Sequence, residues 1–372
     1  MTDESRVYPL AANQSEGERL DAQNVSIKAI LGTNPVHPAL RLALEARIQD
    51  GQTINVLDIA TGTGVFARDL VEAYPQANFR ILLADVTDKF LLESGKNRGE
   101  DAIPKLSTFE TWDLHSDEVP AAVEAFAPDG FDLINARFLL IVLRVNEWDF
   151  FLKRIKTMLA PSTGLLQLTE ATHTWCVQDD YELDRSLPPF DCYPYDPVDL
   201  ARNRGTFNCD NTYHVDRLGA LTLVSKLKAA GFEADGISSI PFAVPNGKEL
   251  TPSRPLVASS RLTKAGSAPG SIPEENNALA ELEDGVDYFA YANLPGPVET
   301  DEGKLREAKV NAMNNGRNIM TMLSQNPRKC GVAGFRTEDE VAKWKEAADA
   351  WLEHHTYFHP CMHVAWQPLR RH

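Results

Sequence analysis

Short apolar runs alternate with amphipathic segments through most of the first 240 residues. The runs of strand length cover residues 54–59, 79–84, 131–134, 165–169 and 232–240, with a weaker run at 107–112. Apolar positions recur at helical spacing between them, in residues 65–74, 147–159 and 216–230. Because strands that alternate with helices form βαβ crossovers, we predict a parallel sheet with helices on both of its faces.

Further helices flank this alternation. Amphipathic patterns predict them at residues 16–30, 40–48, 304–323 and 337–354. The stretch 241–280 is rich in Pro, Ser and Gly and is expected to be a loop. The run 357–366 is a candidate last strand, in which Pro360 predicts a bulge or an edge position.

The simplest organisation is one α/β unit with a long insertion before its last strand. We expect residues 1–50 to form N-terminal lid helices. Residues 51–240 and 357–372 would form the core, and residues 241–356 a cap over the substrate site.

Composition narrows the class of protein. The chain has 43% apolar residues, enough to fill a core, and a net charge of −16, which disfavours nucleic acid as a partner. No apolar run reaches the roughly 20 residues of a membrane helix. The N-terminus lacks the pattern of a secretion signal, and the five cysteines show no C-x-x-C spacing. We therefore expect a cytoplasmic location and reduced thiols; a homodimer stays open.

Candidate chemistry begins where the first strand ends. There the chain reads Asp58-Ile-Ala-Thr-Gly-Thr-Gly64, and glycines let a backbone turn tightly and approach a ligand. The loop lacks the Lys-Ser/Thr pair of a phosphate loop, so an NTPase is disfavoured. Asp85 ends the second strand and Asp113 the third, and ligands of open parallel sheets bind at this edge. Acids at three successive strand ends suit a nucleoside with a cationic tail.

The stretch VLDIATGTG resembles the first motif of class I S-adenosylmethionine-dependent methyltransferases, over about residues 54–240. Tyr8-Pro-Leu10, Arg19-Leu-Asp-Ala-Gln23 and the segment 159–170 are similar to small-molecule methyltransferases of fungal secondary metabolism. The resemblance implies a Rossmann-like seven-stranded methyltransferase sheet of six parallel strands and one antiparallel strand, with helices on both faces and a large cap insertion. It also implies S-adenosyl-L-methionine as the cofactor.

The resemblance also implies site residues. Those that would line the methionine part are Asp58, Ala60, Gly62 and Gly64. Asp85 with Val86 would hold the ribose, Asp113 with Leu114 the adenine, and the backbone carbonyl of Asn135 the amino group. Tyr8, Arg19 and Gln23 would belong to a lid over the cofactor. Ala60 departs from the family, in which this position is glycine.

The acceptor is expected to be a small aromatic or polyketide-like metabolite, methylated at oxygen. Aromatic residues crowd the expected cap segments, at positions 175, 181, 190, 193, 195, 207, 213, 288, 289 and 291. A phenol must lose its proton, and His173 at the mouth of the fifth strand is the leading candidate base, ahead of His214 and His355. Glu170 is expected to orient or cap.

Other interpretations stay open. The cluster His354, His355, His359, Cys361 and His363 invites a metal site, but three neighbours on one strand face rarely converge on one ion, so we predict none. A methyltransferase-like regulator that acts through protein partners is an alternative function. A second is an enzyme that keeps the fold but catalyses a rearrangement without methyl transfer.

Overall fold

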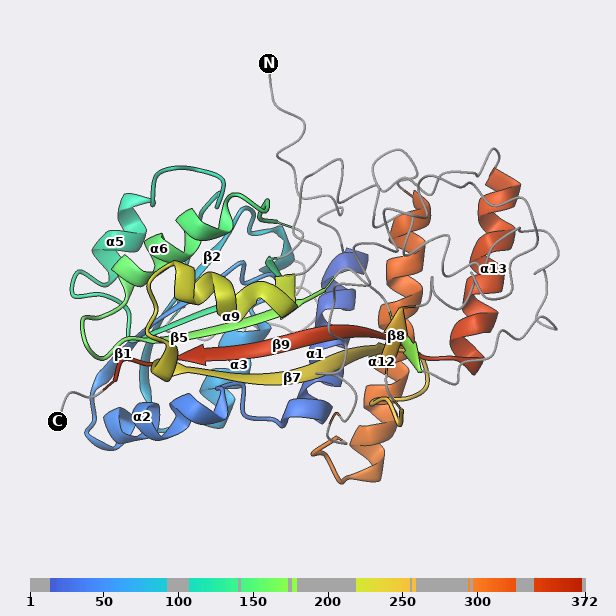
Figure 1. The fold of residues 1–372 in the computed structure, drawn as a ribbon, viewed down its shortest axis with the longest axis horizontal. Helices are drawn as coiled ribbons and strands as arrows, with labels where there is room; N and C mark the ends of the chain where they lie inside the picture. The colour runs from blue at the N-terminus through green and yellow to red at the C-terminus, as the bar shows by residue number, and fades with distance from the viewer. Residues whose placement is uncertain are drawn as a thin grey trace, which may run out of the picture.

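The computed structural model of the chain describes residues 14–91, 107–139, 142–172, 176–178, 219–254, 256–258, 294, 297–325 and 338–369. The ribbon shows a sheet between helices, with two further long helices beside it (Figure 1). No helix in these segments is both long and apolar enough to cross a bilayer.

Five strands form the parallel part of the sheet. They are β1 (Thr53–Ile59), β2 (Asn78–Asp85), β3 (Ser107–Thr111), β4 (Leu133–Arg137) and β5 (Leu165–Ala171), in the order β3-β2-β1-β4-β5. Next to β5 lies β9 (Tyr357–Trp366), antiparallel to it, and β7 (Ile237–Asn246) pairs antiparallel with the far side of β9. Since β5 and β7 therefore run the same way, this part of the sheet has six parallel strands and one antiparallel strand. Two short strands, β6 (Cys176–Gln178) and β8 (Leu256–Ala258), extend the described sheet beyond β9. The predicted fold class is confirmed.

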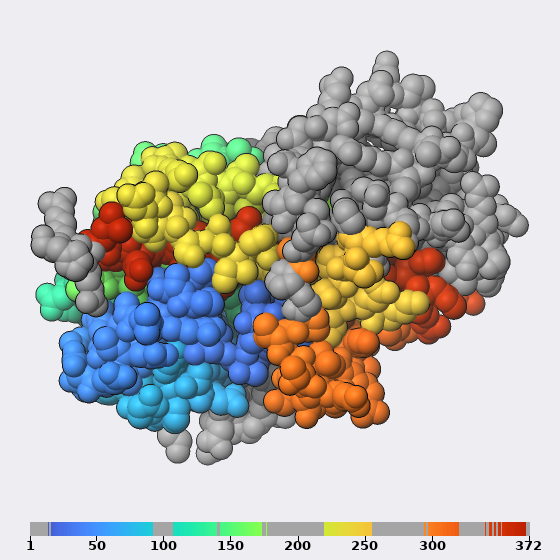
Figure 2. Space-filling model, turned by 60° about the horizontal axis from the view of Figure 1, so that its bottom comes forward, coloured from blue at the N-terminus to red at the C-terminus, as the bar shows by residue number. Residues whose placement is uncertain are grey.

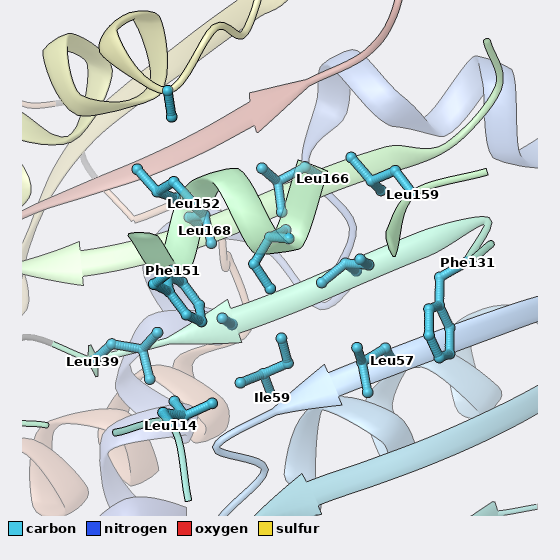
Figure 3. Packing of buried hydrophobic residues seen from close by; sticks show 14 of the residues in the cluster. Leu57, Ile59, Leu114, Phe131, Leu139, Phe151, Leu152, Leu159, Leu166 and Leu168 are labelled. Atoms are coloured by element: carbon cyan, nitrogen blue, oxygen red, sulfur yellow. The ribbon is translucent and has the colours of Figure 1, made fainter. Parts of the chain in front are cut away.

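Helices cover both faces, as predicted. One core cluster joins α6 (Trp148–Met158) and α9 (Gly219–Ala229) to the sheet, and α5 (Ala121–Phe126), which the sequence pattern does not predict, packs there too. Figure 3 shows Phe151 and Leu152 of α6 over Leu57, Leu166 and Leu168 of the strands. On the opposite face, α2 (Pro38–Gln49) and α3 (Val65–Ala73) cover alternate residues of the same strands. Burial on alternate sides fixes the register, because a shift by one residue would move each apolar set into the core on the other face, whose packing it does not match.

The prediction that residues 241 onward are loop is wrong for residues 241–246, which belong to β7. Within the described residues β7 pairs only with β9, so a proline whose nitrogen faces away from β9 loses no ladder hydrogen bond. The backbone nitrogens of Pro241 and Pro245 can both face away from β9, because residues four apart in a strand have the same orientation. The predicted start at Phe232 is also wrong: its ring packs edge-on against Trp366 at 5.0 Å in the turn before β7. A further short strand, β8 (Leu256–Ala258), falls in the expected loop.

The prediction of a bulge or edge position at Pro360 is wrong as well. β9 pairs with β7 in unbroken register and lies between β7 and its partners on the other side. Those partners change at Pro360: pairing with β5 ends at Cys361, and Phe358 pairs with β6 (Cys176–Gln178). The missing N–H therefore falls where one ladder ends and the next begins.

Of the two helices expected as a lid, α2 packs on the sheet and α1 (Gln14–Leu31) lies beyond the strand ends. α1 contacts the long helix α12 (Glu302–Gln325) through small residues, and Ser26 Oγ donates to Ala308 O at 3.4 Å. Figure 2 shows the blue N-terminal segment and orange α12 together on one surface. Helix α13 (Glu338–His354) packs beside α12 and leads into β9.

A buried histidine begins α2 and lies against the sheet. The His37 side chain accepts a hydrogen bond from the backbone N–H of Ala39 at 3.1 Å, and its ring lies 4.7 Å from that of His363 on β9. Burial, aided by the charge of Arg41, lowers the pKa of His37 from 6.5 to about 4. The folded protein therefore favours the neutral imidazole.

We predict that this histidine makes the protein acid-sensitive. Between pH 6.5 and 4 His37 binds a proton in the unfolded chain but not in the folded protein. The free energy of unfolding therefore falls as the pH falls, by about 1–3 kcal/mol. In His37→Asn an amide keeps the cap while the titrating group is gone. Urea unfolding from pH 7.5 to 4.5 should show a shallower pH slope for this variant; an unchanged slope would contradict the assignment.

Candidate functional site

The loop after β1 is a tight turn in left-handed backbone conformation. Ala60, Gly62 and Gly64 have φ angles of 51°, 55° and 70°. A Cβ on Gly62 would lie 3.2 Å from Leu20 of α1, and one on Gly64 only 2.9 Å from Leu91. The positive φ therefore favours glycine at Gly64, and a Cβ there would also displace the tip of the Leu91 side chain. Ala60 accepts a conformation that costs an L-residue roughly 1–2 kcal/mol.

Three backbone N–H groups of this loop already have acceptors within the protein. Thr61 N donates to Ala84 O at 3.1 Å, Gly64 N to Thr61 O at 2.9 Å, and Gly62 N to Asp85 Oδ2 at 2.9 Å. A phosphate-binding loop needs such N–H groups unpaired and turned toward its ligand. These three donors are thus not available to a pyrophosphate.

Asp58, at the end of β1, is held in a row of buried polar side chains. Its carboxylate accepts from Thr61 Oγ1 at 2.6 Å and from Asn135 Nδ2 at 2.7 Å, and Gln167 Nε2 donates to Asn135 Oδ1 at 2.9 Å. The row follows the sheet register, because Asp58 pairs with Asn135 and Asn135 with Gln167. Burial raises the pKa of Asp58, and the charge of Arg137 opposes that shift.

Asp85, at the end of β2, borders the same loop. Burial raises its pKa, while backbone N–H groups of Gly62, Val86 and Thr87 act in the opposite direction and Asp58 adds to the rise. The side chain of Val86 is exposed. Two carboxylates beside one loop make this strand edge an environment for cations and hydroxyl groups.

The end of β3 is the next position along the edge. Asp113 is exposed and its Oδ1 accepts from His115 N at 3.0 Å, while Leu114 is buried in the core. Arg154 of α6 donates to the carbonyl oxygens of Leu114 and Ser116 at 3.1 and 2.7 Å. The segment after β3 is therefore tied to the helix layer.

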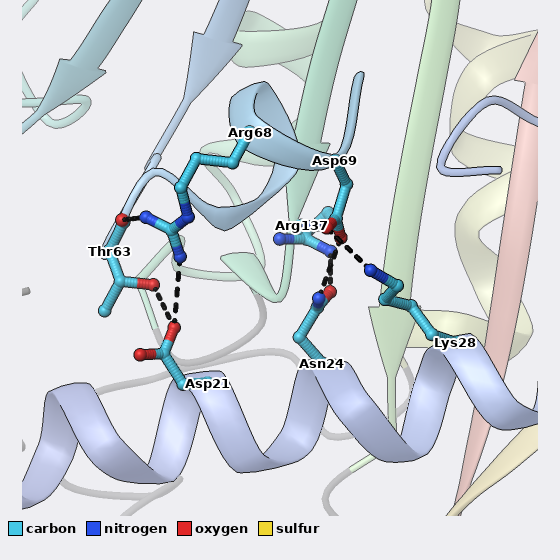
Figure 4. A network of polar contacts seen from close by, with 7 residues as sticks. All are labelled: Asp21, Asn24, Lys28, Thr63, Arg68, Asp69 and Arg137. Atoms are coloured by element: carbon cyan, nitrogen blue, oxygen red, sulfur yellow. Dashed lines mark hydrogen bonds and ion pairs between the residues drawn. The ribbon is translucent and has the colours of Figure 1, made fainter. Parts of the chain in front are cut away.

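Helix α1 is fastened over the loop by polar contacts (Figure 4). Thr63 Oγ1 donates to Asp21 Oδ1 at 2.9 Å, and Arg68 donates to Thr63 O at 2.5 Å. One turn further along, Asp69 accepts from Asn24 at 2.9 Å and from Lys28 at 2.8 Å. The face of α1 that carries residues 17, 20, 21, 24 and 28 thus faces the loop and α3.

The expected lid residues Arg19 and Gln23 lie on another face of α1. Arg19 forms a buried ion pair with Glu16 at 2.7 Å, donates to Gln23 Oε1 at 3.2 Å and reaches Asn315 Oδ1 of α12 at 3.4 Å. Their role toward a cofactor stays a prediction. Tyr8, His173 and His214 lie outside the described residues, as do the ten aromatic positions of the expected cap.

The histidines and the cysteine of β9 make separate hydrogen bonds. His363 Nδ1 pairs with Thr169 Oγ1 at 2.8 Å, His359 Nδ1 with Thr172 O at 3.2 Å, and Cys361 Sγ donates to His359 O at 3.2 Å. Among the residues that the structure describes, no three His, Cys, Asp or Glu side chains could hold a metal ion. His355 is half-buried in the turn before β9. Glu170 is buried and accepts from Leu139 N at 2.8 Å.

Sequence reasoning misses Thr61, Gln167 and Arg137. Gln167 is a polar residue within the apolar strand run LLQLTE, in the same register as Asn135, and that interruption was the available signal. Arg137 ends β4 on the same side as Asn135 and is half-buried. An arginine at a strand end is usually exposed to solvent, so no local pattern marks it.

Comparison with known proteins finds no matching protein-family model and no similar curated sequence. The strand order and directions make this a Rossmann-like methyltransferase fold. A structure from Galdieria sulphuraria, assigned as a sarcosine dimethylglycine methyltransferase, is 12% identical with a TM-score of 0.36, over 88% of this chain and 83% of that one.

Two further structures are of methyltransferases as well. Phosphoethanolamine N-methyltransferase 2 of Haemonchus contortus, crystallised with S-adenosyl-L-methionine, is 13% identical with a TM-score of 0.34, over 91% and 57% of the two chains. An O-methyltransferase family protein from Burkholderia thailandensis is 16% identical with the same TM-score, over 55% and 52%. The match thus spans about half the length of these two proteins. At these values the likeness carries no argument about activity, which must come from the site.

The strained alanine yields a test of the loop geometry. We predict that Ala60→Gly leaves the melting temperature unchanged or raises it by a few degrees. Glycine removes the backbone strain at positive φ in the folded state, and this gain offsets the larger conformational entropy of the unfolded chain. The same substitution in an exposed helical position, Ala46→Gly on α2, should cost about 1 kcal/mol. Calorimetry on both variants compares them, and a clear loss of stability in Ala60→Gly would exclude the strain.

Proposed function

We propose that this protein is an S-adenosyl-L-methionine-dependent methyltransferase. The observation that carries the proposal is the chemistry of the loop after β1: three of its N–H groups are paired within the protein, and carboxylates border it. This favours a nucleoside that carries a positive charge and disfavours one that carries a pyrophosphate.

The bordering carboxylates fit the parts of that cofactor. Asp58 is beside the turn of Ala60, Gly62 and Gly64, where the methionine part with its ammonium group would bind. Asp85, whose Oδ2 is held by Gly62 N–H, would accept from ribose hydroxyls, with Val86 beside it. Asp113 and Leu114 would lie at the adenine, and the Asn135 carbonyl would accept from the amino group.

When bound, this cofactor supplies a methyl group on a positively charged sulfur. In-line displacement requires the acceptor atom opposite that sulfur, so the protein must first position the two. We propose a small aromatic or polyketide-like metabolite methylated at oxygen, with His173 as the base that removes the hydroxyl proton. Tyr8, Arg19 and Gln23 would close the N-terminal side. The aromatic residues of the expected cap suit such an acceptor.

Cofactor binding and the products of the reaction distinguish this function from the two alternatives, a regulator and an enzyme that catalyses a rearrangement. Incubated with S-adenosylmethionine and a panel of phenolic acceptors, a methyltransferase accumulates S-adenosylhomocysteine and a methylated product. An enzyme of rearrangement would convert substrate without S-adenosylhomocysteine. A regulator would bind the cofactor and turn over no acceptor.

The ribose assignment predicts the effect of one carboxylate. Asp85→Ala should weaken S-adenosylhomocysteine binding by roughly tenfold or more, because charge-assisted hydrogen bonds are lost. Asp88→Ala, an exposed acid three residues further on, is the matched control and should bind as wild type. Titration calorimetry measures both. Equal affinity of wild type and Asp85→Ala would contradict the assignment.

The base assignment predicts a separate signature. His173→Asn should lower turnover by about 100-fold or more while cofactor affinity changes little, since a general base acts on the acceptor alone. His354→Asn, an exposed histidine at the end of α13, serves as control. If steady-state rates of His173→Asn equal those of wild type, His173 is not the base.

A further inference from the structure

The guanidinium of Arg137 is fixed at the cofactor edge with hydrogen-bonding capacity left over. Its Nη1 donates to Asn24 Oδ1 at 2.9 Å, and its Cζ lies 5.9 Å from the centre of the Phe66 ring. Within the described segments this is the one hydrogen bond that the guanidinium makes, although the group carries five N–H donors. The residue is half-buried, so solvent satisfies these donors only in part.

Neighbouring acids do not consume these donors. Asp69 accepts from Lys28 and Asn24, and Asp58 accepts from Thr61 and Asn135. Both carboxylates act on Arg137 through charge and raise its pKa, while burial, the larger effect, lowers it. A cation is thus held close to two acids without a direct ion pair to either among the described residues.

The contacts of Arg137 are also rigid. Asn24 belongs to α1, which Lys28 and Asp21 fasten to Asp69 and Arg68 of α3, as Figure 4 shows. Phe66 belongs to the first turn of α3, directly after the glycine loop. The guanidinium is therefore oriented by elements that also define the site, and planar guanidinium groups bind carboxylates through two parallel hydrogen bonds.

We propose that Arg137 binds the α-carboxylate of the amino-acid part of the cofactor. The inference rests on the proposed function. An amino acid carries an ammonium and a carboxylate on one carbon, so its site needs an acid and a base side by side. Asp58 and Arg137, on neighbouring strands β1 and β4, supply this pair. Arg19 is less suited, because Glu16 already occupies its guanidinium through two hydrogen bonds.

The test compares two ligands that differ only in the carboxylate: S-adenosylmethionine and decarboxylated S-adenosylmethionine. Arg137→Met should weaken S-adenosylmethionine binding by about 10- to 100-fold and leave the affinity for the decarboxylated compound nearly unchanged. Arg137→Lys keeps the charge but loses the planar fork. It should therefore show a smaller difference between its loss of affinity for S-adenosylmethionine and its loss for the decarboxylated compound. This second variant also keeps the test valid if Arg137→Met fails to fold. Calorimetry on the full-length chain gives each affinity.

Arg68→Met is the matched control, since Arg68 lies in the same helix interface but bonds Thr63 O and Asp21. It should change the affinities for both ligands by one common factor. If the Arg137 variants also weaken both ligands equally, Arg137 only supports the fold and the inference is wrong. If wild-type protein binds neither ligand, the proposed function itself fails, and the inference with it.

Discussion

A buried carboxylate at the end of β1 is the constraint on which the site depends. Asp58 is 2% exposed, and burying its carboxylate without hydrogen-bond partners would strongly destabilise the fold. A row of polar side chains in register, from Thr61 through Asn135 to Gln167, supplies those partners directly or through a neighbour. Gln167 in turn accepts from His37 N and donates to Pro35 O, which ties the connection between α1 and α2 to the sheet. One charge thus links three strands and the N-terminal segment.

The same segment links the loop to the additional helices. One face of α1 binds the loop and α3, and another carries the buried Arg19–Glu16 pair, which reaches Asn315 of α12. Asn315 donates to Asn246 at the end of β7, 2.8 Å away. A displacement of α1 would therefore disturb the glycine loop, α12 and the end of β7 together, because buried polar networks tolerate few partial arrangements.

How far the sequence predicts the molecule depends on how local the cause is. The positions of Asp58, Gly64 and Asp85 at the loop after β1 could be predicted, because strand ends and positive φ angles impose residue types locally. The extension of β7 through Pro241 and Pro245 could not be predicted. Prolines are tolerated there because β7 lies at the edge of the described sheet, which the sequence pattern does not reveal. The face on which Arg19 lies depends on α12, nearly 300 residues away, so helical periodicity alone does not reveal it. Arg137 is significant only through its neighbours Asn24, Asp58 and Phe66.

Charge balance explains why one edge can combine a buried arginine with several acids. Lys28 and Arg137 stand opposite Asp58 and Asp69, so the region beneath α1 is close to neutral although the whole chain carries −16. A ligand that brings equal and opposite charges, as an amino acid does, leaves that balance intact, whereas a phosphate would add uncompensated negative charge. Asp85, on the other side of the loop, adds a carboxylate without a cation beside it in the contacts described. The edge therefore divides into a half with both charges at β1 and β4 and an acidic half at β2. A molecule with an amino acid at one end and hydroxyl groups at the other would place the amino acid at the first half and the hydroxyl groups at the second.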